Sequence, residues 1–491
     1  MRKTLLILTL QTLLLSSLLA QVTEQIPTAQ QVGAAVCPDE IAPIEAPFAG
    51  MPQLQRPVFP DRSLSIRKTH GNVQKAIDQL SRRGGGHVIV PAGDWQTGRI
   101  TLRDNIDLHL EAGANLHFSG QIADYLPAVL TRNEGVELYS LGALIYADGA
   151  RNIGVTGPSA AERQAGCAPA RLIGPGRDNE IYKHVMGGLV VEDFIDLSSP
   201  VESRVFDGSD LHDLTCLGPK LTGNDSLMEA NQGCIFLPMF FAPINSHNVL
   251  LEGVRFEETL FWNITPVYCD SVIIRGVTVD SYGGRTDGID IESTSNVLIE
   301  YCTLGCGDDC FTLKAGRAED GLRVGKPTER VVIRHCLAER GPGGVTFGSE
   351  TAGMIRQVYM HDCVFNAPSN GFYFKSRRNR GGGGEELTFR RIRMLNPQRA
   401  FYFDLLGSPF YVGELAVRLP IRDITPLTPV YRKITMDQVL VEQCKQVFLI
   451  KGLPERPIED VTVTHLEAKA TEHEFKFSDV LNFVIDNSVI R

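Results

Sequence analysis

Apolar and polar residues alternate along most of this chain, in short runs that recur at a similar spacing. Related nine-residue runs start at positions 248, 271, 296, 330, 357, 386, 433 and 460, for example NVLLEGVRF, SVIIRGVTV and NVLIEYCTL. Successive starts lie 23 to 34 residues apart except for one interval of 47, and no helical pattern separates them. A strand repeat in the mid-twenties is typical of a parallel β-helix, whose coils stack strand on strand while loops absorb the variable length. The sequence therefore predicts an all-β solenoid.

The seventh position of each run is apolar, which predicts one continuous stack in the core. Its occupants are Val254, Val277, Cys302, Cys336, Cys363, Ile392, Val439 and Leu466. We interpret the three cysteines as small core residues rather than as redox or catalytic groups. The chain has eleven cysteines, so at least one thiol is unpaired within it. Cys302, Cys306 and Cys310 lack a histidine or a second cysteine pair at ligand spacing, and we expect no metal site there.

The chain before these repeats has a distinct beginning. Residues 1–20 combine Arg2 and Lys3 with an interrupted apolar run that ends at Ala20, which is typical of a signal peptide. The run falls short of the ~20 residues that a membrane anchor needs, so we expect cleavage near Ala20 and export to the periplasm, the cell surface or the extracellular space. Residues 21–60 carry seven prolines and predict an extended lead-in. Residues 61–491 form the predicted β-helix domain, in which no segment is apolar enough to span a membrane.

One short helix is predicted near the start of that domain. Asn72 precedes a stretch whose apolar positions, 73, 76, 77 and 80, share one helical face, and Gly84 to Gly86 end it. We expect this amphipathic helix to cap the N-terminal end of the stack. From His87 onwards, in HVIVPAG and RITLRDNIDLHL, the pattern changes to strands and turns.

The charge of the chain narrows the choice of partner. The formal net charge of −10 argues against nucleic acid, and an anionic substrate would have to be bound by a local basic cluster. One such cluster contains Lys375, Arg377, Arg378 and Arg380. A solvated turn is the simpler interpretation. In an acidic protein, however, ammonium and guanidinium groups at this density are candidates to hold the carboxylate of a uronic acid.

Two carboxylate clusters provide the candidate chemistry. Asp287, in Thr-Asp-Gly, and the pair Asp308 and Asp309, in Gly-Asp-Asp-Cys, lie 21 residues apart, close to one coil. We expect them on neighbouring coils roughly 5 Å apart, sharing one groove. Clustered carboxylates suit glycoside hydrolysis, in which one protonated carboxyl group acts as the acid and another activates water. The alternative is that both motifs are ordinary turns, which favour Asp and Gly for backbone reasons.

At this point the chain resembles glycoside hydrolase family 28, the polygalacturonases and their relatives. The resemblance rests on TDGIDI at 286–291, GDDC at 307–310, GPGGVTFGS at 341–349 and the stretch around Lys375. It implies a right-handed parallel β-helix that hydrolyses α-linked galacturonic acid with inversion and needs no cofactor or metal. By position, Asp308 resembles the general acid, and Asp287 and Asp309 resemble the groups that activate water. Lys375 resembles the lysine that binds the substrate carboxylate.

Three positions depart from the family pattern. Arg285, Pro342 and Tyr373 stand where the family usually has asparagine, histidine and arginine. We therefore expect an active but respecialised enzyme, either exo-polygalacturonase-like or a rhamnogalacturonan α-galacturonidase, that binds its pectic substrate as a monomer. An exo mode would follow if the loops at 195–233 and 317–328 wall off one end of the groove. The predicted substrate-binding residues are Lys375, Arg285, Arg377, Arg378 and Tyr373.

Two other functions are compatible with the sequence. A polysaccharide lyase would also use a parallel β-helix on uronates, but it would need a basic proton abstractor, and its product would be unsaturated. A catalytically impaired, pectin-binding β-helix would explain the missing histidine and arginine. It predicts that Asp308→Asn leaves the behaviour of the protein unchanged, whereas a hydrolase would lose several orders of magnitude in rate.

Overall fold

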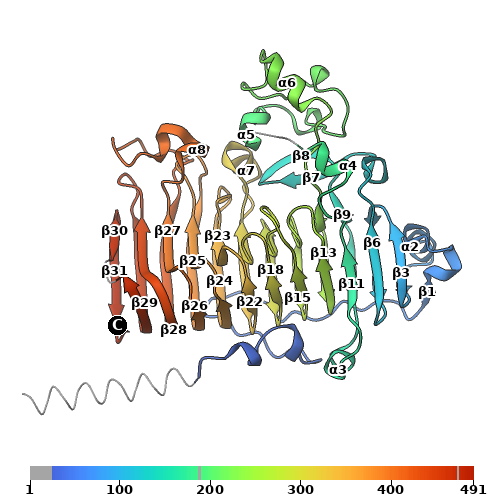
Figure 1. The fold of residues 1–491 in the computed structure, drawn as a ribbon, viewed down its shortest axis with the longest axis horizontal. Coiled ribbons are helices and arrows are strands. Elements are labelled where there is room, and N and C mark those ends of the chain that lie inside the picture. Colours follow the sequence, from blue (N-terminus) through green and yellow to red (C-terminus); the bar gives the residue numbers. More distant parts are fainter. Residues whose placement is uncertain (1–24, 186–189, 473–474) are drawn as a thin grey trace, which may run out of the picture.

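The strands of this protein stack into three parallel ladders that run the length of the molecule (Figure 1). The computed structural model describes residues 25–185, 190–472 and 475–491, so the predicted signal peptide at 1–20 lies outside the described residues. Ladder one consists of β1 (Ser63–Ser65), β2 (Gly86–Val90), β5 (Ile106–Leu110), β10 (Arg151–Thr156), β13 (His247–Glu252), β15 (Asp270–Arg275), β18 (Ser295–Glu300), β21 (Thr328–Arg334), β24 (Ile355–Asn366), β26 (Gly383–Leu395), β28 (Val430–Lys451), β29 (Ile458–Glu472) and β31 (Val480–Asp486).

The other two ladders complete each coil. Ladder two consists of β3 (Gly93–Thr97), β6 (Ala114–Phe118), β11 (Ala170–Ile173), β14 (Val254–Glu257), β16 (Thr278–Asp280), β19 (Thr303–Gly305), β22 (Leu337–Arg340) and β32 (Val489–Ile490). Between β22 and β32 it is formed by the later parts of the long strands β24, β26, β28 and β29. Ladder three consists of β4 (Ile100–Thr101), β9 (Ala143–Asp148), β12 (Met239–Ile244), β17 (Ile289–Glu292), β20 (Phe311–Lys314), β23 (Gly343–Phe347), β25 (Asn370–Lys375), β27 (Arg399–Asp404) and β30 (Lys476–Ser478). Single bridges at Ile264 and Val267 connect β12 to β17, and the end of β28 lies between β27 and β30.

The core is the apolar stack that the repeat predicts. All eight residues at the seventh position of the repeats are buried, and Cys363 pairs in register with Ile392 on the next coil. The thiols of Cys336 and Cys363 each lie 3.4 Å from a backbone nitrogen of the preceding coil. All eleven cysteines are free thiols, and ten of them are buried. The interpretation of Cys302, Cys336 and Cys363 as core residues is confirmed.

The predicted capping helix is present as α2 (Val73–Ser81). Its N-cap is Asn72, whose Oδ1 accepts a hydrogen bond of 2.8 Å from the backbone nitrogen of Lys75. Its four predicted apolar positions are buried, and the helix covers the end of the stack formed by β1 and β2 (Figure 1). Because the first coil has no preceding coil to stack on, this cover keeps its apolar edge out of water.

The lead-in is a strap along the outside of ladder one, as the dark-blue segment below the strands in Figure 1 shows. Its Ile44 and Leu54 pack with outward-facing residues of ladder one, Leu250, Ile273, Leu298 and Val332. Its carbonyl groups accept hydrogen bonds from strand arginines, at Pro38 from Arg275 and at Pro43 from Arg334. The strap contains the 3-10 turns η1 (Ala29–Gln31) and η2 (Ala34–Val36). It explains why the recurring strands are apolar on both faces.

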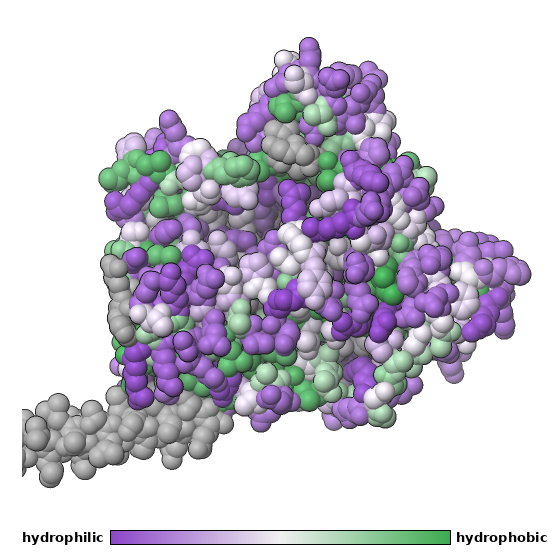
Figure 2. All heavy atoms as spheres, in the orientation of Figure 1, coloured by the Kyte–Doolittle hydropathy of each residue, from purple (hydrophilic) through white to green (hydrophobic). Residues whose placement is uncertain are grey.

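The loops of ladder three build a rim on one side of the solenoid. The largest insertion carries α4 (Glu180–Lys183), α5 (Val191–Phe194) and α6 (Asp225–Asn231) and has its own small core, in which the Phe194, Phe206 and Phe236 rings meet edge to face. The hairpin of β7 (Val129–Asn133) and β8 (Val136–Ser140), α7 (Ala318–Val324) and α8 (Pro409–Val412) join this rim (Figure 1). In Figure 2 a notch separates the lobe over α8 from the lobe over α6.

The described part of the chain contains no helix that is both long and apolar enough to cross a membrane.

Candidate active site

Ladder three carries both predicted carboxylate clusters at the entrance of adjacent strands. Asp287 lies just before β17, and Asp308 and Asp309 lie just before β20. Because Ile289 on β17 pairs with Phe311 on β20, the clusters occupy the same position on neighbouring coils. The structure thus brings these residues together in the way that their spacing predicts.

The three carboxyl groups converge on one point. One oxygen from each of Asp287, Asp308 and Asp309 lies within 4.8 Å of the other two. Asp287 and Asp309 are 4% and 1% exposed, whereas Asp308 is only half-buried. The backbone nitrogens of Arg285 and Asp309 each donate a hydrogen bond of 3.0 Å to the Asp308 carboxylate. Asp308 is therefore the member of the trio that is most open to an incoming ligand.

Two lysines supply counter-charges to this trio. Lys375 Nζ lies 2.8 Å from Asp309 Oδ2, and Lys314 Nζ lies 4.0 Å from Asp287 Oδ2. The spacing of the three carboxylates would also suit a cation. Two ammonium groups already lie against the cluster, so its charge is compensated by residues of the chain itself.

A second layer of charge lies beneath the carboxylates, and the sequence analysis did not single it out. Lys314 Nζ lies 3.1 Å from Glu350 Oε2, 3.6 Å from Asp290 Oδ1 and 4.5 Å from the centre of the Trp262 ring. Neither carboxylate oxygen of Asp290 has a hydrogen-bond partner among the described residues. The signal that could have revealed the layer is a polar residue at every second place of an apolar strand, Asp290 in IDIE and Lys314 in FTLK.

Burial and mutual repulsion decide where protons reside in this network. Burial, followed by the charges of Asp290 and Asp308, holds the pKa of Asp287 well above its usual range, and burial does the same for Asp290. Burial opposes the charge of Glu350, but Lys314 and Arg317 outweigh it and hold the pKa of Glu350 well below its usual range. Asp287 and Asp290 therefore favour the protonated form, whereas Glu350 stays ionised beside Lys314 and Arg317.

The site contains a pocket of about 170 Å³, and ion pairs form one of its walls. Arg317 lies 2.7 Å from Glu350 and 3.2 Å from Glu134, which sits at the tip of the β7–β8 hairpin, and it also pairs with Glu192 of α5. Arg380 Nη1 lies 2.6 Å from Glu192 Oε1. Burial opposes ionisation of Glu192, but Arg317 and Arg380 lower the pKa of Glu192 to about 2. The inserted loop is thus tied to the solenoid beside the three carboxylates.

The comparisons with known proteins agree with this arrangement. The model of the glycosyl hydrolases family 28 matches residues 201–403, which include all three carboxylates and Lys375. A probable polygalacturonase of Vitis vinifera is 24% identical over 430 residues, which cover 83% of this chain and 73% of that protein. An exo-poly-α-D-galacturonosidase of Dickeya chrysanthemi is 24% identical over 336 residues, covering 66% of this chain and 52% of that protein. The exopolygalacturonase of Thermotoga maritima has a TM-score of 0.71 and 25% identity, covering 89% of this chain and 94% of that one.

The chain is related to the family 28 glycosyl hydrolases. The predicted family, the right-handed parallel β-helix and the enzyme class, a glycoside hydrolase, are thereby confirmed. The chain spans about three-quarters of the Vitis relative and about half of the Dickeya relative. The specific substrate, the catalytic residues, export and the monomeric state stay predictions.

Three of the five predicted substrate-binding residues line the pocket of this family 28 relative: Lys375, Arg285 and Arg377. Arg285 lies 3.6 Å from Glu134, and its side chain is 44% exposed, so donors remain free for a ligand. The guanidinium of Arg377 lies 4.2 Å from the centre of the Tyr411 ring, which forms part of the same wall.

The other two predicted binding residues lie elsewhere. Tyr373 stacks on Tyr402 with ring centres 4.8 Å apart and is not among the residues that line the pocket. Arg378 is buried, binds Glu455 at 2.6 Å and donates hydrogen bonds to the carbonyl groups of Leu415, Val417 and Arg418. Arg378 therefore does not face the pocket and instead anchors the loop that follows α8, the helix that carries Tyr411.

The glycine-rich stretch that resembles the family 28 motif packs directly against the acids. A Cβ atom on Gly343 would lie 2.3 Å from Asp309 Oδ1, and one on Gly341 would lie 2.7 Å from the carbonyl oxygen of Asp308. The absence of side chains there lets the coil of β23 approach the carboxylates. The carbonyl of Pro342, at the position of the usual histidine, accepts a hydrogen bond of 2.7 Å from the backbone nitrogen of Asn370.

Proposed function

We propose that this protein is an exo-acting glycoside hydrolase that releases galacturonic acid from the end of a pectic chain. The proposal rests on the convergence of three carboxylates within 4.8 Å, two of which, Asp287 and Asp308, line a small pocket. The loop tied down by Glu192 favours an exo mode, because it blocks one direction in which a polymer could continue. The names of the Dickeya and Thermotoga relatives, both exo-acting on polygalacturonan, are consistent with this mode.

The proposed roles follow from exposure and charge. Asp308, the most open carboxyl group, donates a proton to the leaving oxygen, and Asp287 and Asp309 position and deprotonate the attacking water. The raised pKa of Asp287 supports a shared proton within the trio, from which Asp308 can be supplied. Inversion, which the family resemblance implies, is part of the proposal.

The substrate class follows from the positive groups at the pocket. Lys375, Arg285 and Arg377 present ammonium and guanidinium groups beside the acids, and these groups bind carboxylates strongly. Lys375 has three donor protons, so it can hold Asp309 and a sugar carboxylate together. Arg285, which lines the pocket and replaces the asparagine usual in the family, is proposed to decide between a smooth polygalacturonan and a branched rhamnogalacturonan.

Export and a monomeric state belong to the same proposal. The charged start, apolar run and Ala20 of the first 20 residues support removal of a signal peptide. N-terminal sequencing of the mature protein tests export, with a start near Gln21 as the expected result. A start at Met1 in every cell fraction would contradict it.

The function is tested by incubating the mature protein and its Asp308→Asn variant with polygalacturonan and with rhamnogalacturonan fragments. The expected result is saturated galacturonic acid from the wild type and a rate lower by several orders of magnitude for the variant. An unsaturated product that absorbs in the ultraviolet would mean a lyase. Binding without any product, by both proteins, would leave a pectin-binding module.

A further inference from the structure

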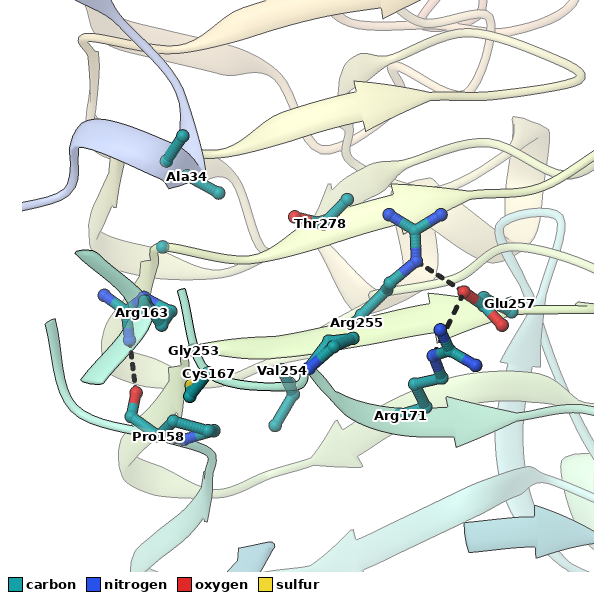
Figure 3. Close-up of a pocket in the computed structure, with 13 residues that line it drawn as sticks. Ala34, Pro158, Arg163, Cys167, Arg171, Gly253, Val254, Arg255, Glu257 and Thr278 are labelled. Atoms are coloured by element: carbon teal, nitrogen blue, oxygen red, sulfur yellow. Dashed lines mark hydrogen bonds and ion pairs between the residues drawn. The ribbon is translucent and has the colours of Figure 1, made fainter. Parts of the chain in front are cut away.

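A second pocket lies on the flank of the solenoid, and the proposed reaction does not use it. It has a volume of about 420 Å³, within the range of roughly 300–1,000 Å³ that is usual for ligand sites. Its walls come from the strap at Ala34, from the loop that follows α3 (Ala160–Gln164), and from β11, β14 and β16 of ladder two (Figure 3). None of its lining residues also lines the catalytic pocket.

Three arginines from three different elements face this flank pocket. Figure 3 shows Arg163 from α3, Arg171 from β11 and Arg255 from β14 around it, with Glu257 as the acidic residue among them. The lining residues thus include three positive groups and one negative group, in a chain whose formal net charge is −10, and Asp280 adds a second carboxylate beside Arg255. A local field of this sign attracts anions that the protein as a whole repels.

The donors of two of these arginines are not satisfied by the protein. Arg163 donates to the carbonyl of Pro158, but its Nε and Nη2 are buried without a hydrogen-bond partner, and no carboxylate of the described residues pairs with it. Arg171 lies 3.8 Å from Glu257, beyond hydrogen-bond distance, and its Nε also lacks a partner. Buried guanidinium donors without partners are costly, and an anion in the pocket would satisfy them.

The backbone around Arg163 leaves room for its guanidinium. A Cβ atom on Gly253 would lie 2.5 Å from Arg163 Nη1, and one on Gly276 would lie 2.9 Å from Arg163 Nη2. Arg255 is held in place by Glu257 and by Asp280, the latter at 2.7 Å. Arg255 thus serves as a fixed wall, and Arg163 and Arg171 are the groups with donors to offer.

We propose that the flank pocket binds a short acidic oligosaccharide, a pair of linked uronic acid residues, through the guanidinium groups of Arg163 and Arg171. Two adjacent carboxylates match the two guanidinium groups that have unpartnered donors, those of Arg163 and Arg171, and planar guanidinium groups pair with carboxylates in a bidentate manner. A pocket of this size accommodates sugar rings, whereas a small inorganic anion would leave most of it empty. The choice of a uronic acid rests on the proposed function, and binding here would retain the polymer beside the enzyme between cleavage events.

The lining residue Cys167 provides a direct probe of occupancy. It is half-buried, while the other ten cysteines are buried, so iodoacetamide should alkylate Cys167 in preference to every other thiol. The experiment uses the full protein carrying Asp308→Asn, so that digalacturonate stays intact. The rate of Cys167 alkylation, followed by mass spectrometry, is measured with increasing digalacturonate.

The expected result is that saturating digalacturonate slows the alkylation at least about tenfold. Arg171→Gln should raise the digalacturonate concentration that gives half-maximal protection at least about tenfold, because each charge-assisted hydrogen bond contributes strongly to binding. The Arg171 side chain is 43% exposed, so this variant should fold normally. Arg163→Gln should have the same effect, and Arg103→Gln, a change at an exposed arginine that does not line the pocket, should have none.

Two further probes identify the ligand chemistry. Neutral galactobiose should give no protection, and inorganic phosphate should give none at the same concentration. Equal protection by phosphate would overturn the assignment to a sugar acid, and protection that survives Arg163→Gln and Arg171→Gln would overturn the site. Because the readout needs no turnover, it stands even if the wild type fails to hydrolyse any galacturonate.

Discussion

Lys314 is the residue whose replacement tests the buried charge network most severely. Its side chain is 4% exposed, and its ammonium nitrogen lies 3.1 Å from Glu350, 3.6 Å from Asp290 and 4.0 Å from Asp287. Lys314→Met keeps a side chain of similar length and removes the charge. Glu350 is the partner that stays ionised at pH 7, because its pKa is held well below its usual range.

The size of the effect follows from that one pair. Two unit charges 3.1 Å apart attract each other by about 5 kcal/mol at an effective dielectric constant of about 20. Asp287 and Asp290 attract the Lys314 ammonium group less strongly, because burial raises the pKa of each and favours the neutral form. Removing one partner of a buried pair typically costs about 3–5 kcal/mol, so we expect a loss of that size in the free energy of unfolding at pH 7.

The pH dependence of this loss has a definite sign. Glu350 has a lower pKa in the folded state than in the unfolded state, so its contribution is fully present above the unfolded value of 4.5 and is lost as the pH falls below it. The difference between wild type and Lys314→Met should therefore shrink as the pH falls below about 4.5. Without Lys314, Asp287 should also be harder to ionise, which moves the acidic limb of the kcat/KM profile to higher pH.

The assay is urea unfolding followed by circular dichroism between pH 3 and pH 8, with a matched surface variant. Lys433→Met removes a 55% exposed ammonium group that lies 3.5 Å from Glu386, and a surface pair of this kind contributes at most about 1 kcal/mol. A loss no larger than that of Lys433→Met, or one that does not vary with pH, would mean that the Lys314–Glu350 pair does not stabilise the fold.

Three further changes probe the walls of the site. Arg378→Gln should free the loop after α8 and with it Tyr411, raising KM on oligogalacturonates about tenfold or more while kcat changes less. Glu192→Gln should loosen the inserted wall, so that longer products appear beside the monosaccharide. It should also lower the melting temperature. That decrease should become smaller as the pH falls from about 4.5 to about 2, because the pKa of Glu192 is lowered from 4.5 in the unfolded chain to about 2 in the folded protein. Gly343→Ala should displace Asp309, whose Oδ1 would lie 2.3 Å from the new methyl group, and lower kcat at least about 100-fold.

Each of these changes has a control close to it in kind. Arg103→Gln, Glu229→Gln and Gly284→Ala alter exposed residues or open space and should leave kinetics and products unchanged. An unchanged KM for Arg378→Gln would mean that the loop after α8 needs no anchor. A product pattern of Glu192→Gln identical to that of the wild type would remove the basis for the exo mode. Full activity of Gly343→Ala would show that the position of Asp309 is not critical.

Much of this structure can be predicted from the local periodicity of the sequence. The stack from Val254 to Leu466 and the buried face of α2 both follow from residues that repeat at the period of their element. The meeting of Asp287 with Asp308 also follows from one number, the length of a coil. These features depend on neighbours along the chain or one coil away, and such neighbours can be read from spacing alone.

Contacts between distant segments are the part that spacing does not reveal. Arg377 and Arg378 are adjacent, yet Arg377 lines the pocket while Arg378 binds Glu455, which lies 77 residues further on. The strap is similar, since nothing in its prolines indicates that Ile44 covers the outer face of β15 and β18. Lys314 was overlooked because a single lysine in a strand is usually solvated, and its burial depends on partners from two other coils.

The most direct test of the central claim is proton NMR of the hydrolysis of trigalacturonate, followed in real time for the wild type and Asp308→Asn. The wild type is expected to release one galacturonic acid at a time from the non-reducing end. The released sugar should appear first as the β-anomer, because an α-linkage is cleaved with inversion, and the variant should release almost none. Initial appearance of the α-anomer, an unsaturated product, or equal release by both proteins would contradict the account.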